Sequence, residues 1–206
     1  MRHNRTSGFP SRVLATGVGL SLVLTTSSCT GGDNDPANAG ATPADAENAT
    51  SVAILGAELP VDTYPDVSGP LEATCPYLDG VVVESLTGER WTGTSLDSRF
   101  DPPACVFWSY AQVPQAVVSV RRMTTHQGAV DVVNWAAPVE TTTKALQPVG
   151  WSGGRGGTSD SEYGVSGGGA VYSVFRQNVA VSVWTTQDQS VKAQQITEQS
   201  IANLGL

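Results

Sequence analysis

The feature that most constrains the fold is a pair of apolar segments near the C-terminus, Ala170–Arg176 and Val179–Thr185, which only Gln177-Asn178 separates. A two-residue connection between such segments predicts a β-hairpin with a tight turn. In the register of that turn, one face carries Tyr172, Val174, Val179, Val181 and Val183, and the other carries Val171, Phe175, Ala180 and Trp184. The hairpin therefore predicts an antiparallel sheet.

Weaker patterns predict the elements around this hairpin. Runs rich in β-branched and aromatic residues favour strands over Trp91–Ser98, Ala104–Tyr110 and Gln115–Met123. The glycine-rich residues 139–169 show neither strand nor helix periodicity, so we expect an irregular segment there.

Helical spacing of apolar residues predicts three helices. The first begins at Cys75-Pro76 with Thr74 as its cap, ends at Gly88, and has Leu78, Val81, Val82 and Ser85 on one face. The second follows Gly128, with Ala129, Val132, Val133 and Ala136 as its apolar stripe, and the third is Val191–Leu204 with Ser190 as its cap. This order of elements indicates an α+β fold, a single domain in which helices pack on one face of an antiparallel sheet.

The first 28 residues are typical of a secretory signal peptide. Arg2, Arg5 and Arg12 form a basic region, and the uncharged, largely apolar run Val13–Leu24 follows. That run is too short to cross a bilayer about 30 Å thick as a stable helix, and a short apolar run behind basic residues indicates export.

The end of this signal, Thr26-Ser27-Ser28-Cys29, resembles the lipobox of bacterial lipoproteins. In that motif a cysteine behind small residues receives a diacylglycerol and becomes the first residue of the mature chain; an aliphatic residue is usual where Thr26 stands. The resemblance implies a lipid, palmitate included, on Cys29, and an extracytoplasmic domain anchored to the outer face of the plasma membrane. The alternative is a free cysteine in a signal peptide that is discarded.

Composition divides the rest of the chain in two. Residues 29–51 are rich in Ala, Asp, Asn, Gly, Pro and Thr and lack large apolar side chains, so we expect a disordered tether behind the lipidated cysteine. Residues 52–206 are enough for one extracytoplasmic domain with one core.

The charge of the mature chain limits its partners. Cleavage before Cys29 removes three arginines and leaves 8 basic against 19 acidic residues, a net charge of −11. Such a chain is a poor partner for nucleic acid, and charge does not draw it to anionic lipids. Its attachment to the membrane is therefore expected to depend on acyl chains.

Two cysteines remain once Cys29 carries the lipid, Cys75 and Cys105. In an exported chain such a pair predicts one disulfide. Two buried free thiols are the alternative.

Several short motifs together resemble a known family. They are Cys75-Pro76-Tyr77-Leu78-Asp79, Asp101-Pro102-Pro103-Ala104-Cys105, Gly150-Trp151 and the closing VAVSVWTTQDQSVKAQQI. The set is similar to a family of actinobacterial lipoproteins that carries a domain of unknown function, over about Leu71 to Ile196. The resemblance implies an exported, membrane-tethered domain with two cysteines, and it brings no catalytic residue.

The sequence offers little chemistry of its own. Ser166 lies in a Gly-x-Ser-x-Gly motif, but a strand rather than a helix follows, and no histidine comes after it as a hydrolase of that type requires. His126 is expected on the surface or at a helix cap. The one histidine of the expected mature chain and a bridged cysteine pair do not make a usual zinc site, so we expect no metal and no cofactor.

Aromatic residues form the candidate binding surface. Trp108 and Tyr110 share one face of their strand, and Phe175 and Trp184 share one face of the hairpin. One possibility is an open apolar groove for a ligand or partner. The other is that residues 139–169, with Trp151, fold over these rings and make a second small core. Arg155 in that segment either binds a partner's carboxylate or lies at a solvated tip.

These observations favour a non-enzymatic envelope lipoprotein that binds an envelope ligand or another envelope protein. The competing class is a cell-wall hydrolase or transferase that uses carboxylates such as Asp97 and Asp101. A purely structural surface protein is the third possibility.

Overall fold

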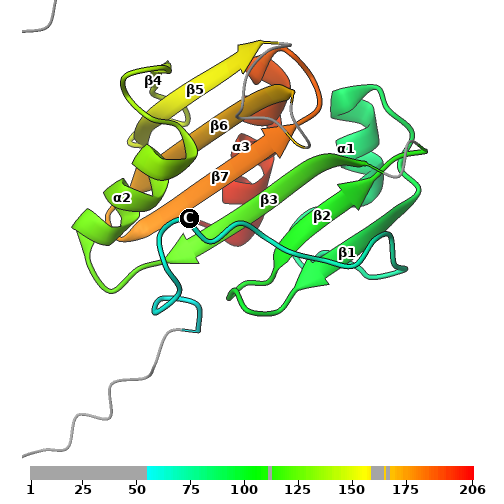
Figure 1. Cartoon of the computed structure of the whole chain (residues 1–206), viewed down its shortest axis with the longest axis horizontal. Coiled ribbons are helices and arrows are strands. Elements are labelled where there is room, and N and C mark those ends of the chain that lie inside the picture. Colours follow the sequence, from blue (N-terminus) through cyan, green and yellow to red (C-terminus); the bar gives the residue numbers. More distant parts are fainter. Residues whose placement is uncertain (1–54, 111–112, 159–164, 166–167) are drawn as a thin grey trace, which may run out of the picture. The chain divides into compact units, whose positions relative to one another are not determined.

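An antiparallel sheet of seven strands, in the order β1-β2-β3-β7-β6-β5-β4, forms the centre of the molecule (Figure 1). This computed structural model describes residues 55–110, 113–158, 165 and 168–206, which belong to one structural unit. The expected signal peptide and tether (residues 1–51) and Ser166 lie outside the described residues. The strands are β1 Gly93–Asp97, β2 Ala104–Trp108, β3 Pro114–Arg122, β4 Thr143–Ala145, β5 Ser152–Thr158, β6 Gly169–Arg176 and β7 Val179–Thr185.

The C-terminal hairpin is confirmed as β6 and β7, with Gln177-Asn178 as its turn. Tyr172 pairs with Val183 and Val174 pairs with Val181, which is the expected register. Gln177 has a φ of 55°, the left-handed conformation that such tight turns require. The α+β class and the single antiparallel domain are confirmed as well.

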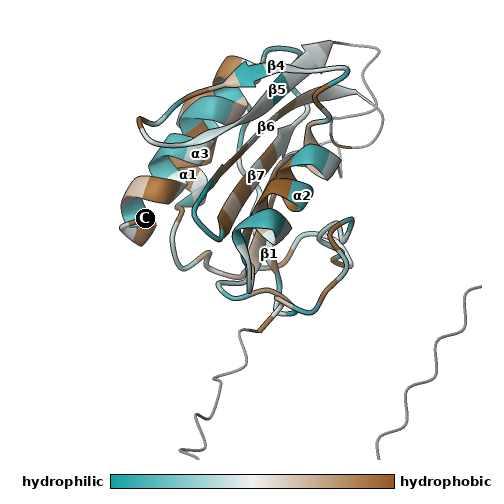
Figure 2. Cartoon of the chain, turned by 90° about the vertical axis from the view of Figure 1, so that its left-hand side faces the viewer, coloured by the Kyte–Doolittle hydropathy of each residue, from teal (hydrophilic) through white to brown (hydrophobic). Residues whose placement is uncertain are grey.

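The helices α1 Gly80–Thr87, α2 His126–Ala136 and α3 Ser190–Leu204 cover both faces of the sheet (Figure 2). On one face, α1 and α3 enclose the valine side of the hairpin, with Val83 and Ile196 among the buried contacts. On the other face, α2 packs Ala129, Val132 and Val133 against the Ala180 side. The expectation that all helices pack on one face is wrong, because both faces of the hairpin are apolar and each needs a cover.

Part of the glycine-rich segment 139–169 is regular rather than irregular, because its described residues supply strands β4 and β5. Glycine is required in β5 by close packing. A Cβ built on Gly153 would lie 2.0 Å from the backbone oxygen of Ser173, and one on Gly157 would lie 2.5 Å from that of Asp188. Glycine has a low strand propensity, so the pattern concealed the strand.

Two helices begin at other residues than expected. α1 begins at Gly80, where the Asp79 side chain accepts a hydrogen bond from Val81 N, and not at Cys75. Its buried residues are Gly80, Val83 and Thr87, whereas Val81 is 60% exposed. α2 begins two residues before Gly128, with Thr125 as its cap, and its expected apolar stripe is confirmed. α3 is confirmed over Val191–Leu204, although Ser190 is its first residue rather than its cap.

A buried arginine holds the segment that leads into the sheet. The Arg121 guanidinium on β3 donates hydrogen bonds to the backbone oxygens of Gly56, Leu59 and Pro60, at 2.7–3.1 Å. It also lies 5.6 Å from the centre of the Phe100 ring. Burial lowers the pKa of Arg121 from its usual range. Backbone carbonyls therefore take the place of a carboxylate partner here.

Among the residues that the structure describes, no helix has the length and apolar character needed to cross a membrane.

The packing of β5 predicts that Gly153→Ala destabilises the domain. The new methyl group would collide with the backbone of β6, which cannot move aside as a flexible side chain could. We expect a loss of about 2 kcal/mol or more in the free energy of unfolding, measured by chemical denaturation. The control is Ser152→Ala, on the neighbouring exposed residue of β5. Equal stability of the two variants would contradict this account of the strand.

Candidate functional site

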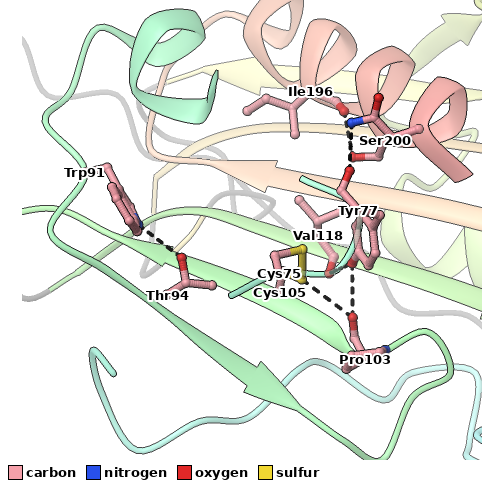
Figure 3. The surroundings of a disulfide bond; sticks show 10 residues. Cys75, Tyr77, Trp91, Thr94, Pro103, Cys105, Val118, Ile196 and Ser200 are labelled. Atoms are coloured by element: carbon pink, nitrogen blue, oxygen red, sulfur yellow. Dashed lines mark hydrogen bonds between the residues drawn. A yellow bond between two sulfur atoms is a disulfide. The ribbon is translucent and has the colours of Figure 1, made fainter. Parts of the chain in front are cut away.

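A disulfide between Cys75 and Cys105 ties the segment before α1 to the middle strand of the β1–β2–β3 region (Figure 3). The two Cα atoms are 5.8 Å apart, and both cysteines are buried. The predicted pairing is thus confirmed. The bridge spans 30 residues of sequence, which include α1 and β1.

Tyr77 adds polar links to the same corner. Its hydroxyl donates to the backbone oxygen of Pro103 at 3.1 Å and lies 3.4 Å from that of Val118 (Figure 3). Its own backbone oxygen accepts a hydrogen bond from Asn203 of α3, at 2.8 Å. Burial raises the pKa of the Tyr77 phenol, so the hydroxyl keeps its proton and remains a donor. The segment before α1 is therefore fixed to β2, β3 and α3.

The side chain of Trp91 packs against the first turn of α1. A Cβ built on Gly80 would be 2.2–2.5 Å from three atoms of the indole ring, so the ring rests directly on the glycine. The indole N–H donates to Thr94 Oγ1 at 3.0 Å, as Figure 3 shows, and the backbone N–H donates to a carboxylate oxygen of Glu84 at 2.9 Å. These contacts fix the position of the ring.

A cleft opens beside this ring, and we call it the Trp91 cleft. It consists of two hollows, about 140 and 340 Å³, that share Ala73, Thr74 and Trp91 as lining residues. The smaller one is further lined by Cys75, Leu78, Asp79, Gly80 and Thr94, and the larger one by Glu72, Thr92 and Gly93.

The outer wall of the cleft is held to the edge of the sheet. Thr94 of β1 donates from its backbone N–H to Leu71 O at 2.9 Å, and its backbone oxygen accepts from Ala73 N at 3.1 Å. Gly93 allows this approach, because a Cβ there would lie 2.9 Å from Leu71 O. The wall is continuous with Cys75 and so with the disulfide.

The charged side chains that line the cleft are acidic. Glu72 and Asp79 are the charged residues among its lining, and both are exposed. In the part of the chain that the structure describes, the one ion pair joins Asp97 and Arg99, so neither lining carboxylate is neutralised by a basic side chain. Asp79 uses one oxygen as the helix cap of α1.

The predicted aromatic surface is not a single open site. Trp108 and Trp184 are buried on the α2 face, 7% and 4% exposed, with the ring of Tyr64 centred 5.0 Å from that of Trp184. Val165 also packs against this cluster. Trp151, by contrast, is buried on the opposite face. The rings are therefore covered, but by α2, the Tyr64 segment and Val165 rather than by Trp151.

The other predicted residues are scattered over the domain. Tyr110 is 72% exposed beyond the end of β2. Phe175 is half-buried beside the ring of His126, and the two ring centres are 5.4 Å apart. Arg155 lies in the middle of β5, paired with Tyr172 and Thr143, and not at a loop tip.

The candidate catalytic carboxylates do not form a pair at a cleft. Asp97 is buried and accepts hydrogen bonds from Arg99 and from Asp66 N. Burial alone would raise the pKa of Asp97, but the hydrogen bonds from Arg99 and Asp66 outweigh it and lower the pKa. Asp101 precedes a cis proline in the β1–β2 turn. Asp97 therefore has a structural role in holding the N-terminal segment.

His126 lies at the start of α2, as a capping or surface histidine would. Its Nδ1 atom is 2.6 Å from the backbone oxygen of Gln177, in the hairpin turn. Within the described part of the chain, no group of three or more His, Cys, Asp or Glu residues could hold a metal ion.

The sequence did not indicate the Trp91 cleft. Trp91 was expected to begin a strand, and no periodic pattern relates it to Gly80, eleven residues earlier. The glycine at the first position of α1 is the one local signal, because glycine is a poor helix former there unless something packs against it.

The fold and the site define a disulfide-bridged α+β domain with a small cleft beside the bridge. Residues 59–206 match the family described as domain of unknown function DUF2020, and the chain belongs to that family. The match includes both cysteines and the whole Trp91 cleft. No curated protein matches the chain.

The contact between Trp91 and Gly80 predicts that Gly80→Ala displaces the indole ring. We expect a loss of about 1–3 kcal/mol in the free energy of unfolding and a shift of the Trp91 indole N–H resonance. The control is Val81→Ala on the same turn, which removes exposed atoms and should change stability by less than about 0.5 kcal/mol. An unshifted Trp91 resonance in Gly80→Ala would show that the ring does not rest there.

The disulfide predicts a large stability loss when both cysteines are replaced. Closing a loop of this length contributes about 3.5–4 kcal/mol in the chain-entropy treatment, so Cys75→Ala/Cys105→Ala should lose that amount. Thermal unfolding with and without reductant measures it. Reductant should lower the midpoint of the native chain and leave that of the double variant unchanged; a reductant effect of the same size on both would contradict the assignment.

Proposed function

We propose that this chain is an exported bacterial lipoprotein, anchored through Cys29 to the outer face of the plasma membrane. The observation that carries the proposal is the Cys75–Cys105 disulfide, because structural disulfides form and persist in oxidising compartments outside the cytosol. The basic and apolar N-terminus and the lipobox-like Thr26–Cys29 support it independently.

In this proposal residues 1–28 are the signal peptide and residues 29–51 form a tether. Cys29 carries a diacylglycerol and a fatty acid such as palmitate. Each buried methylene contributes about 0.8 kcal/mol, and two or more chains together give stable anchoring. The actinobacterial lipoproteins that the sequence resembles have the same arrangement. Residues 52–206 are then the part that meets molecules of the cell envelope.

The molecular role we propose is binding rather than catalysis. The support is the Trp91 cleft, in which a fixed aromatic ring lines each hollow together with one exposed carboxylate, and the structural engagement of Asp97 by Arg99. A ring fixed in advance binds without a reordering cost. A hydrolase or transferase that uses Asp97 would have to break the hydrogen bonds that hold the N-terminal segment.

The lipid anchor is tested by metabolic labelling with a fatty acid in an actinobacterial host. We expect the native chain to be labelled and to fractionate with membranes, and Cys29→Ser to be neither labelled nor processed at this site. Thr26→Leu is the matched control, because it brings the motif closer to the usual lipobox and should be labelled at least as well. A Cys29→Ser chain that still takes up label would refute the anchor.

A further inference from the structure

The Trp91 cleft combines an aromatic wall with unneutralised negative charge, and this combination selects a class of ligand. We propose that the cleft binds an organic ammonium cation, with the charged nitrogen over the Trp91 ring and within reach of Glu72 and Asp79. This inference rests on the proposed function as a binding module and gives that module its ligand class.

The ring is prepared for such a ligand. Gly80 supports it, Thr94 Oγ1 accepts its N–H at 3.0 Å, and its remaining surface lines both hollows of the cleft. Tryptophan has the most electron-rich face among the side chains and attracts Lys, Arg and quaternary ammonium groups within about 6 Å of the ring centre. Because the ring is already held, binding costs little conformational entropy.

The charges nearby favour a cation over an anion or a neutral ligand. Glu72 and Asp79 line the cleft, and Glu84 accepts the backbone N–H of Trp91. No lysine or arginine is among the lining residues. Asp97 differs from these carboxylates, because the ion pair with Arg99 neutralises its charge. Carboxylates near a cleft without a basic partner raise the local concentration of cations.

The size of the cleft fits a small head group rather than a folded partner. The smaller hollow, about 140 Å³, has the buried residues Cys75 and Leu78 in its lining, and the larger one has the exposed residues Glu72 and Thr92. A trimethylammonium or primary ammonium group fills the first, and the rest of the molecule lies in the second. The apolar lining residues of the smaller hollow suit the methyl or methylene groups attached to the charged nitrogen.

Choline and 3,3-dimethylbutan-1-ol provide the test, because they have the same shape and differ in charge. The full-length chain, labelled with ¹⁵N in its tryptophan side chains, is titrated with each. We expect choline to shift the Trp91 indole resonance saturably, with a dissociation constant on the order of 1 mM, and the neutral alcohol to bind at least about tenfold more weakly. Trp91→Phe assigns the resonance.

Variants of the two lining carboxylates test whether they supply the charge that attracts the ligand. Glu72→Gln/Asp79→Asn should weaken choline binding by about three- to tenfold and reduce its dependence on salt, while the amide introduced by Asp79→Asn still caps α1. Glu58→Gln, an exposed carboxylate outside the cleft, is the matched control and should bind as the native chain does. A tryptophan resonance that choline never shifts saturably, or one that both probes shift with equal affinity, overturns the proposal.

Further probes separate the sources of the ammonium group. Nα-acetyl-lysine amide represents a peptide amine, its Nε-acetylated form removes the charge, and phosphatidylcholine vesicles represent a lipid head group. Binding by any ammonium form and not by its neutral partner supports the proposal. The titrations are repeated on Cys29→Ser. If the native chain is never lipidated but binds choline, the anchor alone is refuted, whereas a native chain that is lipidated but does not bind choline refutes this inference alone.

Discussion

Apolar side chains on both faces of β6 and β7 impose the requirement that the rest of the fold meets. Val181 and Val183 face α1 and α3, whereas Ala180 and Trp184 face α2. Because neither face can be left to water, helices lie on both sides of an antiparallel sheet. On the α2 face, small side chains form a row across three strands of the sheet. These are Ser119, Ser182 and Ser173, which pair side by side and are buried. The two hairpin serines lie 2.6 Å apart, Oγ to Oγ, and satisfy one another there.

The disulfide extends this packed centre to the other half of the sheet. β1 and β2 bring their own apolar residues, but the segment that covers them has no regular structure before Gly80. Cys105 on β2 and the Tyr77 hydroxyl on the backbone of Pro103 fix that segment where a helix would otherwise be needed. α1 can then begin late, at Gly80, with its first turn against the Trp91 ring. The cleft is thus a consequence of how the bridge positions α1, and not an accident of a loose surface.

Elements that depend on local sequence patterns could be predicted from the sequence, whereas contacts between segments far apart in the chain could not. The hairpin followed from a two-residue turn, the disulfide from a single possible pairing, and α3 from a stripe of apolar residues. β5 escaped prediction because Gly153 is explained by the backbone of β6, which the sequence does not place beside it. The predicted start of α1 at Cys75 is wrong for a similar reason. The disulfide holds Cys75 against β2, so the chain does not become helical there. Trp91 meets Gly80 only once both elements are folded, and therefore the site had no local pattern.

Acidity alone cannot make one place on this protein a binding site. The mature chain, as proposed, has 19 acidic residues against 8 basic ones, and this net negative charge attracts cations without selecting one position on the surface. The choice has to come from geometry. The fold holds Trp91 in the cleft by three contacts: Gly80 packs against the indole ring, Thr94 accepts the ring N–H, and Glu84 accepts the backbone N–H. In the proposed site, the net negative charge attracts a cation to the protein, and the Trp91 ring provides the position at which it binds.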